Sequence, residues 1–305
     1  MASFPLFRTS FVFSCLVAAS LLPGCTPQDV SFDWPQSNEP LLMVEGVLTS
    51  VNDDNYVRLT WGRKPSETQV KPVDNALVII SDNLGNTDTL EKENPKPPNP
   101  FEGYYYPRKL RSTVGRTYSL TIKIGTATYT ATTYMPRVPA IDSVRTRYMI
   151  SPTPVKGGRY TADISFREPK NENNFYQTLV CDDGPPNSYI PSCRTSYYSW
   201  NFSLFDDALL PEKVEFLNIT NSNGIVTRWN VPFAIRNRWN KVQLRSLTKE
   251  GFAYEKAILQ ILTSDGGVFS PTPSNAPTNL KSDHPVTGFF HAMDVSEYKF
   301  YVENP

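Results

Sequence analysis

The stretch Thr117-Tyr118-Ser119-Leu120-Thr121-Ile122-Lys123-Ile124 decides the fold class, because its apolar and polar residues alternate one by one. Successive side chains of a β-strand point to opposite faces of a sheet, so this pattern indicates a strand with one buried and one exposed face. Gly125 then turns the chain into a second alternating stretch, residues 127–132. The two stretches predict consecutive strands of an antiparallel sheet.

Similar stretches precede this pair, with turn residues between them. They cover residues 41–48, 56–61, 72–80 and 103–106. About seven short strands at this spacing are typical of an antiparallel β-sandwich, which we expect over residues 40–136 in an immunoglobulin- or transthyretin-like form. The segment Pro136-Arg137-Val138-Pro139 predicts the end of this domain, because paired prolines interrupt regular structure.

The remaining residues, 141–305, predict a larger β-rich domain with one helix. Strand candidates cover residues 160–166, 175–180, 197–205, 214–219, 242–247 and 298–302. Within residues 252–263 the apolar residues instead follow the spacing of an amphipathic helix packed on a core: Tyr254, Ile258, Ile261 and Leu262. The sequence therefore predicts a mainly β protein with a single amphipathic helix in its C-terminal part.

The first residues have the layout of an export signal. An apolar run, residues 11–22, follows Arg8, and Leu22, Gly24 and Cys25 match the bacterial lipobox. A membrane span needs about 20 apolar residues, so this shorter run does not predict a transmembrane anchor. We predict a lipoprotein signal peptide over residues 1–24, lipidation of Cys25 and a polar tether over residues 25–39. The alternative is an ordinary cleaved signal with a cysteine beside it.

Two cysteines, Cys181 and Cys193, remain once Cys15 and Cys25 are assigned to the signal and the lipid. In an exported chain an even number of remaining cysteines indicates a disulfide, so we predict one between Cys181 and Cys193. The alternative is a metal pair, but the chain has only two histidines, His284 and His291, and no local motif supplies carboxylate ligands. We therefore predict no metal and no cofactor.

Charge and motifs point away from several functions. The chain has 30 basic and 30 acidic residues and no basic stripe, so nucleic acid is not an expected partner. No Gly-x-Ser-x-Gly element occurs, and His284 and His291, near Asp283 and Asp294, are expected to be surface or cap pairs. We therefore predict no catalytic residues, although the paired carboxylates of a glycoside hydrolase come together only in the fold.

Two further groups have a structural and a functional interpretation. Asp206 and Asp207, with Glu212, are expected to form a solvated turn rather than a cation site. The aromatic clusters Tyr104-Tyr105-Tyr106 and Tyr197-Tyr198-Ser199-Trp200 are expected to pack in the core or on edge strands. Stacking of these rings on a sugar or peptide is the alternative.

An ordered series of short elements resembles domain-of-unknown-function family 4249. Near the N-terminus these are Val44-Glu45-Gly46, Val73-Asp74-Asn75-Ala76-Leu77-Val78, Gly103-Tyr104-Tyr105 and Gly115-Arg116-Thr117-Tyr118-Ser119-Leu120. Later ones are Phe166-Arg167-Glu168-Pro169, Asn174-Phe175-Tyr176, Phe205-Asp206-Asp207, Asn275, Asn279-Leu280 and Gly288-Phe289-Phe290. The resemblance covers roughly residues 39–304, and its specificity comes from the order of the elements.

The resemblance implies a surface or periplasmic lipoprotein of Bacteroidetes, of a kind commonly encoded beside TonB-dependent outer-membrane receptors. It carries over no catalytic residues. Gln28-Asp29 is a partial match to the acidic signal that directs such proteins to the cell surface, so the leaflet stays open.

We therefore expect a lipid-anchored outer-membrane protein, not an enzyme, that binds a ligand or partner as an accessory of a TonB-dependent transporter. A hydrolase of surface polymers and a structural or adhesive surface protein are the alternatives. The candidate contact loops are residues 94–106 and 270–279, because they are rich in aromatic residues and proline.

Overall fold

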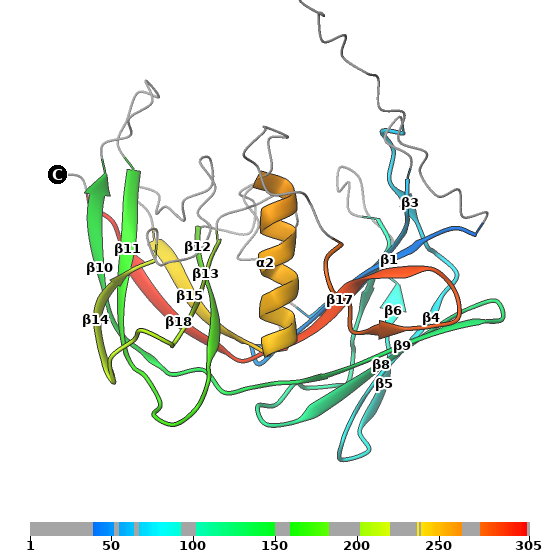
Figure 1. Ribbon diagram of the computed structural model, residues 1–305, viewed down its shortest axis with the longest axis horizontal. Coiled ribbons are helices and arrows are strands. Elements are labelled where there is room, and N and C mark those ends of the chain that lie inside the picture. Colours follow the sequence, from blue (N-terminus) through cyan, green and yellow to red (C-terminus); the bar gives the residue numbers. More distant parts are fainter. Residues whose placement is uncertain are drawn as a thin grey trace, which may run out of the picture. The chain divides into compact units, whose positions relative to one another are not determined.

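The alternating residues 117–124 form strand β8 (Thr117–Ile124), which pairs antiparallel with β9 (Ala127–Tyr134) in the computed structural model (Figure 1). Tyr118, Leu120 and Ile122 are fully buried, as the alternation predicts. β4 (Leu77–Asp82) and β5 (Thr87–Thr89) extend the sheet beyond β8, and β16 (Leu280–Lys281) pairs with β9. The result is a five-stranded sheet in the order β16-β9-β8-β4-β5.

The structure describes residues 39–51, 55–63, 67–92, 102–149, 159–182, 202–219, 237, 239–263 and 275–303. Cys25 and Cys193 lie outside these residues, as do residues 197–200 and, within the candidate contact loops, residues 94–101 and 270–274. In the described part of the chain, no helix has the length and apolar character needed to cross a bilayer.

A second sheet has six strands in the order β17-β1-β2-β7-β6, with β3 beside β2. They are β1 (Leu42–Thr49), β2 (Tyr56–Trp61), β3 (Lys71–Pro72), β6 (Glu91–Lys92), β7 (Tyr104–Tyr106) and β17 (Val286–Met293). The β1–β17 pair is parallel and the other pairs are antiparallel. The six-stranded and five-stranded sheets share one core, whose fully buried members include Leu42, Leu59, Ile80, Leu120 and Phe290.

The second half of the chain builds two smaller sheets. One has the order β10-β11-β14: β10 (Ile141–Met149), β11 (Arg159–Arg167) and β14 (Lys213–Asn218). The other has the order β13-β12-β15-β18: β13 (Phe202–Asp206), β12 (Phe175–Asp182), β15 (Trp239–Leu247) and β18 (Val295–Tyr301). Ile164, Phe166, Tyr176, Val242 and Leu244 are fully buried in the core that these two sheets share.

Helix α2 (Lys249–Thr263) contains the predicted helical residues 252–263. It begins after Thr248, whose Oγ1 accepts a hydrogen bond from the N–H of Gly251 at 3.0 Å, the arrangement of an N-cap. Tyr254 is buried as predicted, Ile258 and Ile261 are only half-buried, and Leu259, which the predicted stripe omits, is buried. The helix contacts β12, β13, β15 and β17 (Figure 1).

The mainly β fold class is confirmed, and its immunoglobulin- or transthyretin-like form stays a prediction. The sheets do not divide at Pro136, because β16 and β17 come from the second half of the chain and pair with β9 and β1. Residues 39–305 form one compact unit. The proposed limits 40–136 and 141–305 therefore stay a prediction, but strand pairing does not follow them.

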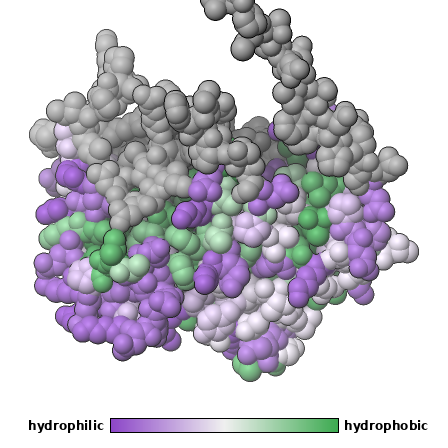
Figure 2. Space-filling model, viewed as in Figure 1, coloured by the Kyte–Doolittle hydropathy of each residue, from purple (hydrophilic) through white to green (hydrophobic). Residues whose placement is uncertain are grey.

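The exposed large apolar residues are scattered over different elements, as is normal for a folded surface. The most exposed ones in the described part of the chain include Leu209, Leu84 and Trp239. Figure 2 shows one face of the molecule, on which hydrophilic residues predominate and hydrophobic ones also appear.

Asp88 of β5 fixes the segment that follows β7. Its Oδ2 accepts hydrogen bonds from the backbone N–H groups of Arg108 (2.8 Å), Lys109 (2.6 Å) and Leu110 (2.8 Å). Burial by itself raises the pKa of this carboxyl, but the three donors outweigh it and hold the pKa below its ordinary value.

Asp88→Asn is therefore expected to lower the free energy of unfolding by about 1–3 kcal/mol at neutral pH, because the charged acceptor of three backbone N–H groups is lost. Because the folded pKa is depressed, the stabilisation is present above the ordinary pKa of 3.8 and is lost as the pH falls through the folded value. Urea unfolding of both proteins at neutral and acid pH measures this. The exposed Asp283 supplies the control Asp283→Asn, and an equal effect of both substitutions would contradict the role of Asp88.

Candidate functional site

Two elements that carry the family resemblance meet side by side, although they lie at opposite ends of the chain. In the parallel β1–β17 pair, Val44 is opposite Gly288, Glu45 is opposite Phe289 and Gly46 is opposite Phe290. The approach at Gly288 requires glycine, because a Cβ there would lie 1.9 Å from the Val44 carbonyl oxygen and its φ is 110°. We call this pair, with α2 packed against it, the junction.

Helix α2 contacts the junction through aromatic and charged side chains. Tyr254 stacks on Phe289 with ring centroids 5.0 Å apart. His291 is 7% exposed, and its Nε2 lies 3.1 Å from Glu255 Oε1, which is within ion-pair distance although the alignment is not that of a hydrogen bond. The expectation of a surface or cap pair is therefore wrong for His291. Asp294 instead accepts a hydrogen bond from the Val138 N–H at 2.9 Å.

Glu45 is the most perturbed carboxyl of the junction. Its Oε1 accepts a hydrogen bond from the Tyr56 hydroxyl at 2.5 Å, and its Oε2 lies 3.9 Å from Arg58 Nη1. Burial raises the pKa of Glu45 to about 7, and the charge of Glu255 adds to the rise, against the lowering effects of Tyr56 and Arg58. Burial and the Glu45 charge also raise the pKa of Tyr56 well above its ordinary value.

A small pocket opens beside Glu45, with a volume of about 160 Å³. β1, β2, β17 and α2 line it with Met43, Val44, Glu45, Arg58, Thr60, Tyr254, Ile258, Thr287 and Gly288. Glu45 and Arg58 are the acidic and basic side chains among these residues, and each side chain is 13% exposed. The pocket therefore places one carboxylate and one guanidinium in largely dry surroundings.

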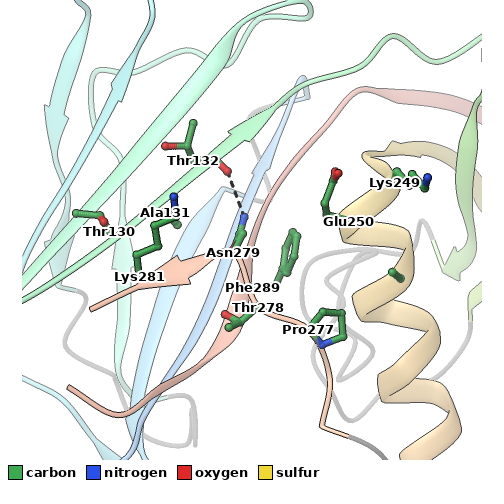
Figure 3. A pocket seen from close by; sticks show the side chains of 11 residues that line it. Thr130, Ala131, Thr132, Lys249, Glu250, Pro277, Thr278, Asn279, Lys281 and Phe289 are labelled. Carbon is green, nitrogen blue, oxygen red and sulfur yellow. Dashed lines mark hydrogen bonds between the residues drawn. The ribbon is translucent and has the colours of Figure 1, made fainter. Parts of the chain in front are cut away.

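A larger pocket, about 660 Å³, is lined by β9, β16, the segment before β16, Phe289 of β17 and the start of α2. In Figure 3, Thr130, Thr132 and Asn279 lie on one side of it, and Lys249 and Glu250 of α2 lie on the other. The Asn279 amide is held firmly, because its Nδ2 donates to Phe290 O at 2.9 Å and its Oδ1 accepts from Phe290 N at 3.0 Å. The part of the pocket wall formed by Asn279 is therefore preformed.

The Phe166–Pro169 and Asn174–Tyr176 elements of the resemblance meet in a structural cluster. The buried Glu168 accepts hydrogen bonds from the Tyr176 hydroxyl (2.8 and 3.0 Å) and from Asn174 Nδ2 (3.0 Å). Burial raises the pKa of Glu168. Asp206 ends β13 and accepts from the Ala208 N–H, and Asp207, the first residue after this strand, accepts from the Asn174 N–H.

The other residues singled out from the sequence have separate environments. Tyr104 and Tyr105 are buried, and the Tyr105 hydroxyl donates to Val73 O at 2.8 Å, as expected for core packing. His284 is exposed, with Nδ1 3.3 Å from Glu39 Oε2. Cys181 is a disulfide cysteine, and its pairing with Cys193 stays a prediction because Cys193 is not among the described residues. In the described ranges, no group of three or more His, Cys, Asp or Glu side chains could hold a metal ion.

The sheets and the junction define a mainly β protein in which the first and the penultimate strand build one site. The chain belongs to the family described as Domain of unknown function (DUF4249), which matches residues 28–299. The predicted resemblance is thereby confirmed. No curated protein matches the chain.

Proposed function

We propose that this protein is an outer-membrane or surface lipoprotein, anchored through Cys25, that binds a ligand or partner as a non-catalytic accessory of a TonB-dependent transporter. The family membership and the lipobox, Leu22 to Cys25, support this proposal. The observation that carries the binding role is the larger pocket of about 660 Å³, which lies within the usual range of ligand sites.

The lining of that pocket suits recognition. The residues that line it include the polar Thr130 and Thr132 and the apolar Ala253 and Pro277. A wall fixed by the Asn279 hydrogen bonds loses little freedom when a partner binds, which favours affinity. The predicted candidate loop, residues 270–279, contributes its last three residues to this pocket.

A lipid anchor would make even a weak interface effective. Each buried methylene contributes about 0.8 kcal/mol, so the two or three acyl chains of a lipoprotein hold a protein stably at a membrane. A tether over residues 25–39 would keep the folded part near the transporter at high effective concentration.

The test begins with the anchor. Cys25→Ala is expected to abolish labelling by a fatty-acid analogue and to release the protein from membranes. Cys15→Ala, a matched substitution inside the predicted signal, is expected to leave both unchanged. A Cys25→Ala protein that still labels and still sediments with membranes would contradict the anchor.

The partner is tested by affinity purification from native outer membranes. The wild-type protein is expected to recover a TonB-dependent transporter, and Ala253→Trp, which fills the larger pocket from an exposed position of α2, is expected to lose it. A matched Ala→Trp control is Ala140→Trp, at an exposed position between β9 and β10. Repeated recovery of the protein alone would contradict the accessory role.

Glu45 supports a second candidate, the hydrolase of surface polymers, because a carboxyl with a pKa of about 7 in a pocket is typical of a general acid. The small volume of that pocket argues against a polymer substrate. Turnover of a polysaccharide or peptide that is lost in Glu45→Gln would favour this candidate over the first.

A further inference from the structure

Glu45 of β1 and Arg58 of β2 are cross-strand neighbours that line the small pocket without a direct hydrogen bond between them. The 3.9 Å between Oε2 and Nη1 is within ion-pair range but is longer than a hydrogen bond. Glu45 Oε1 is engaged by Tyr56, and Arg58 Nε points to the carbonyl of Glu102 at 3.4 Å. Among the described residues, Glu45 Oε2 and the terminal nitrogens of Arg58 thus have no hydrogen-bond partner.

The size and walls of the pocket limit what could bind these groups. A volume of about 160 Å³ equals that of roughly five water molecules at about 30 Å³ each. A ligand of five or six non-hydrogen atoms would fill it, and a sugar chain or peptide would not. The side chains of Met43 and Ile258 provide apolar surface beside the two charges.

We propose that this pocket binds a small free α-amino acid of the size of alanine. The ammonium group donates to Glu45 Oε2, the carboxylate accepts from the terminal N–H groups of Arg58, and the short side chain lies against Ile258. The ligand then makes one charge-assisted hydrogen bond through its ammonium group and another through its carboxylate.

The electrostatics of the junction agree with this assignment. Glu45 is costly to ionise there because burial and the charge of Glu255 oppose its negative form. An ammonium group beside it would favour the ionised carboxylate and lower its pKa. This inference stands apart from the transporter partner, which would bind elsewhere, at the larger pocket.

Ligand-observed NMR on the full-length protein in detergent tests the proposal with three probes. L-alanine carries both charges, ethylamine carries only the ammonium group and propionate carries only the carboxylate. L-alanine is expected to bind at least about tenfold more tightly than either half-ligand, because each loses one of the two charged contacts. Glu45→Gln and Arg58→Gln are each expected to weaken L-alanine binding at least about tenfold.

Two further variants separate binding from folding. Ile258→Trp narrows the pocket without touching either charge and is expected to abolish binding, whereas Glu303→Gln, at an exposed position after β18, is expected to bind like wild type. Far-UV circular dichroism verifies that each variant is folded. Absence of L-alanine binding to wild type, equal binding of propionate, or undiminished binding to folded Glu45→Gln would each overturn the proposal.

Discussion

Gly288→Ala is expected to destabilise the protein by more than about 4 kcal/mol, which is exceptional for one added methyl group. The new Cβ would lie 1.9 Å from the Val44 carbonyl oxygen and 2.8 Å from its carbonyl carbon, both backbone atoms of the paired strand. Neither can move aside without opening the β1–β17 pair. The φ of 110° adds strain of its own, because a side chain rarely adopts that conformation.

Substitutions of two other glycines distinguish the effect of the steric clash from that of the backbone strain. Gly85 has a φ of 86° and open space around it, so Gly85→Ala is expected to cost only about 1 kcal/mol. At Gly46 a Cβ would meet Phe290 Cδ2 at 2.7 Å, a side-chain atom that can shift, so its cost is expected to be intermediate. Urea unfolding, or soluble yield where a variant does not fold, gives the ranking. Equal losses for Gly288→Ala and Gly85→Ala would show that the strand contact is not the cause.

Glu45→Gln is expected to remove a pH dependence that is opposite in sign to the usual one for a carboxylate. The pKa of Glu45 is about 7 in the folded protein and 4.5 ordinarily, so the folded state binds the extra proton between these values. Its contribution to stability is therefore fully present below about pH 4.5 and is lost as the pH rises through about 7. From about pH 5.5 to about pH 8 the wild type should lose about 2 kcal/mol relative to Glu45→Gln.

Urea unfolding at the two pH values measures this difference between the two proteins, which cancels the titration of groups they share. Gln keeps the carbonyl oxygen that accepts from Tyr56, so at high pH the variant is expected to be the more stable protein. Glu250→Gln, on the exposed face of α2, is expected to follow the wild type at both values. The raised pKa would be contradicted if the stability of the wild type, relative to that of Glu45→Gln, increased from acid to alkaline pH.

Strands whose residues alternate were predictable, whereas β10 (Ile141–Met149) was not among the predicted strands. β8 and β9 are predicted from residues 117–132 alone, since consecutive antiparallel strands need only a turn between them. The β1–β17 pair was not predictable, because the pattern of a strand reports its faces and not its partner. A parallel pair in particular leaves no turn to reveal it.

The site was largely missed for a related reason. Residues 41–48 were predicted to form a strand, but their pattern did not single out Glu45. In the structure Val44 is buried in the core and Glu45 lies on the other face of β1. A strand pattern could not show that Tyr254 and Ile258 of α2 lie beside Glu45 on that face. His291 was misassigned on the same ground, since its neighbour Asp294 is close in sequence but Glu255 of α2 is its neighbour in space.

The parallel pair also joins two strands that the ribosome makes at very different times. Val44 and Gly288 are 244 residues apart in the chain, so a ribosome adding about 5–20 residues per second completes β17 roughly 12–50 seconds after β1. During that interval the backbone edge of β1 that β17 will cover lacks its final partner, and open strand edges recruit other chains. The nascent protein therefore exposes this edge of its first strand until β17 has been translated.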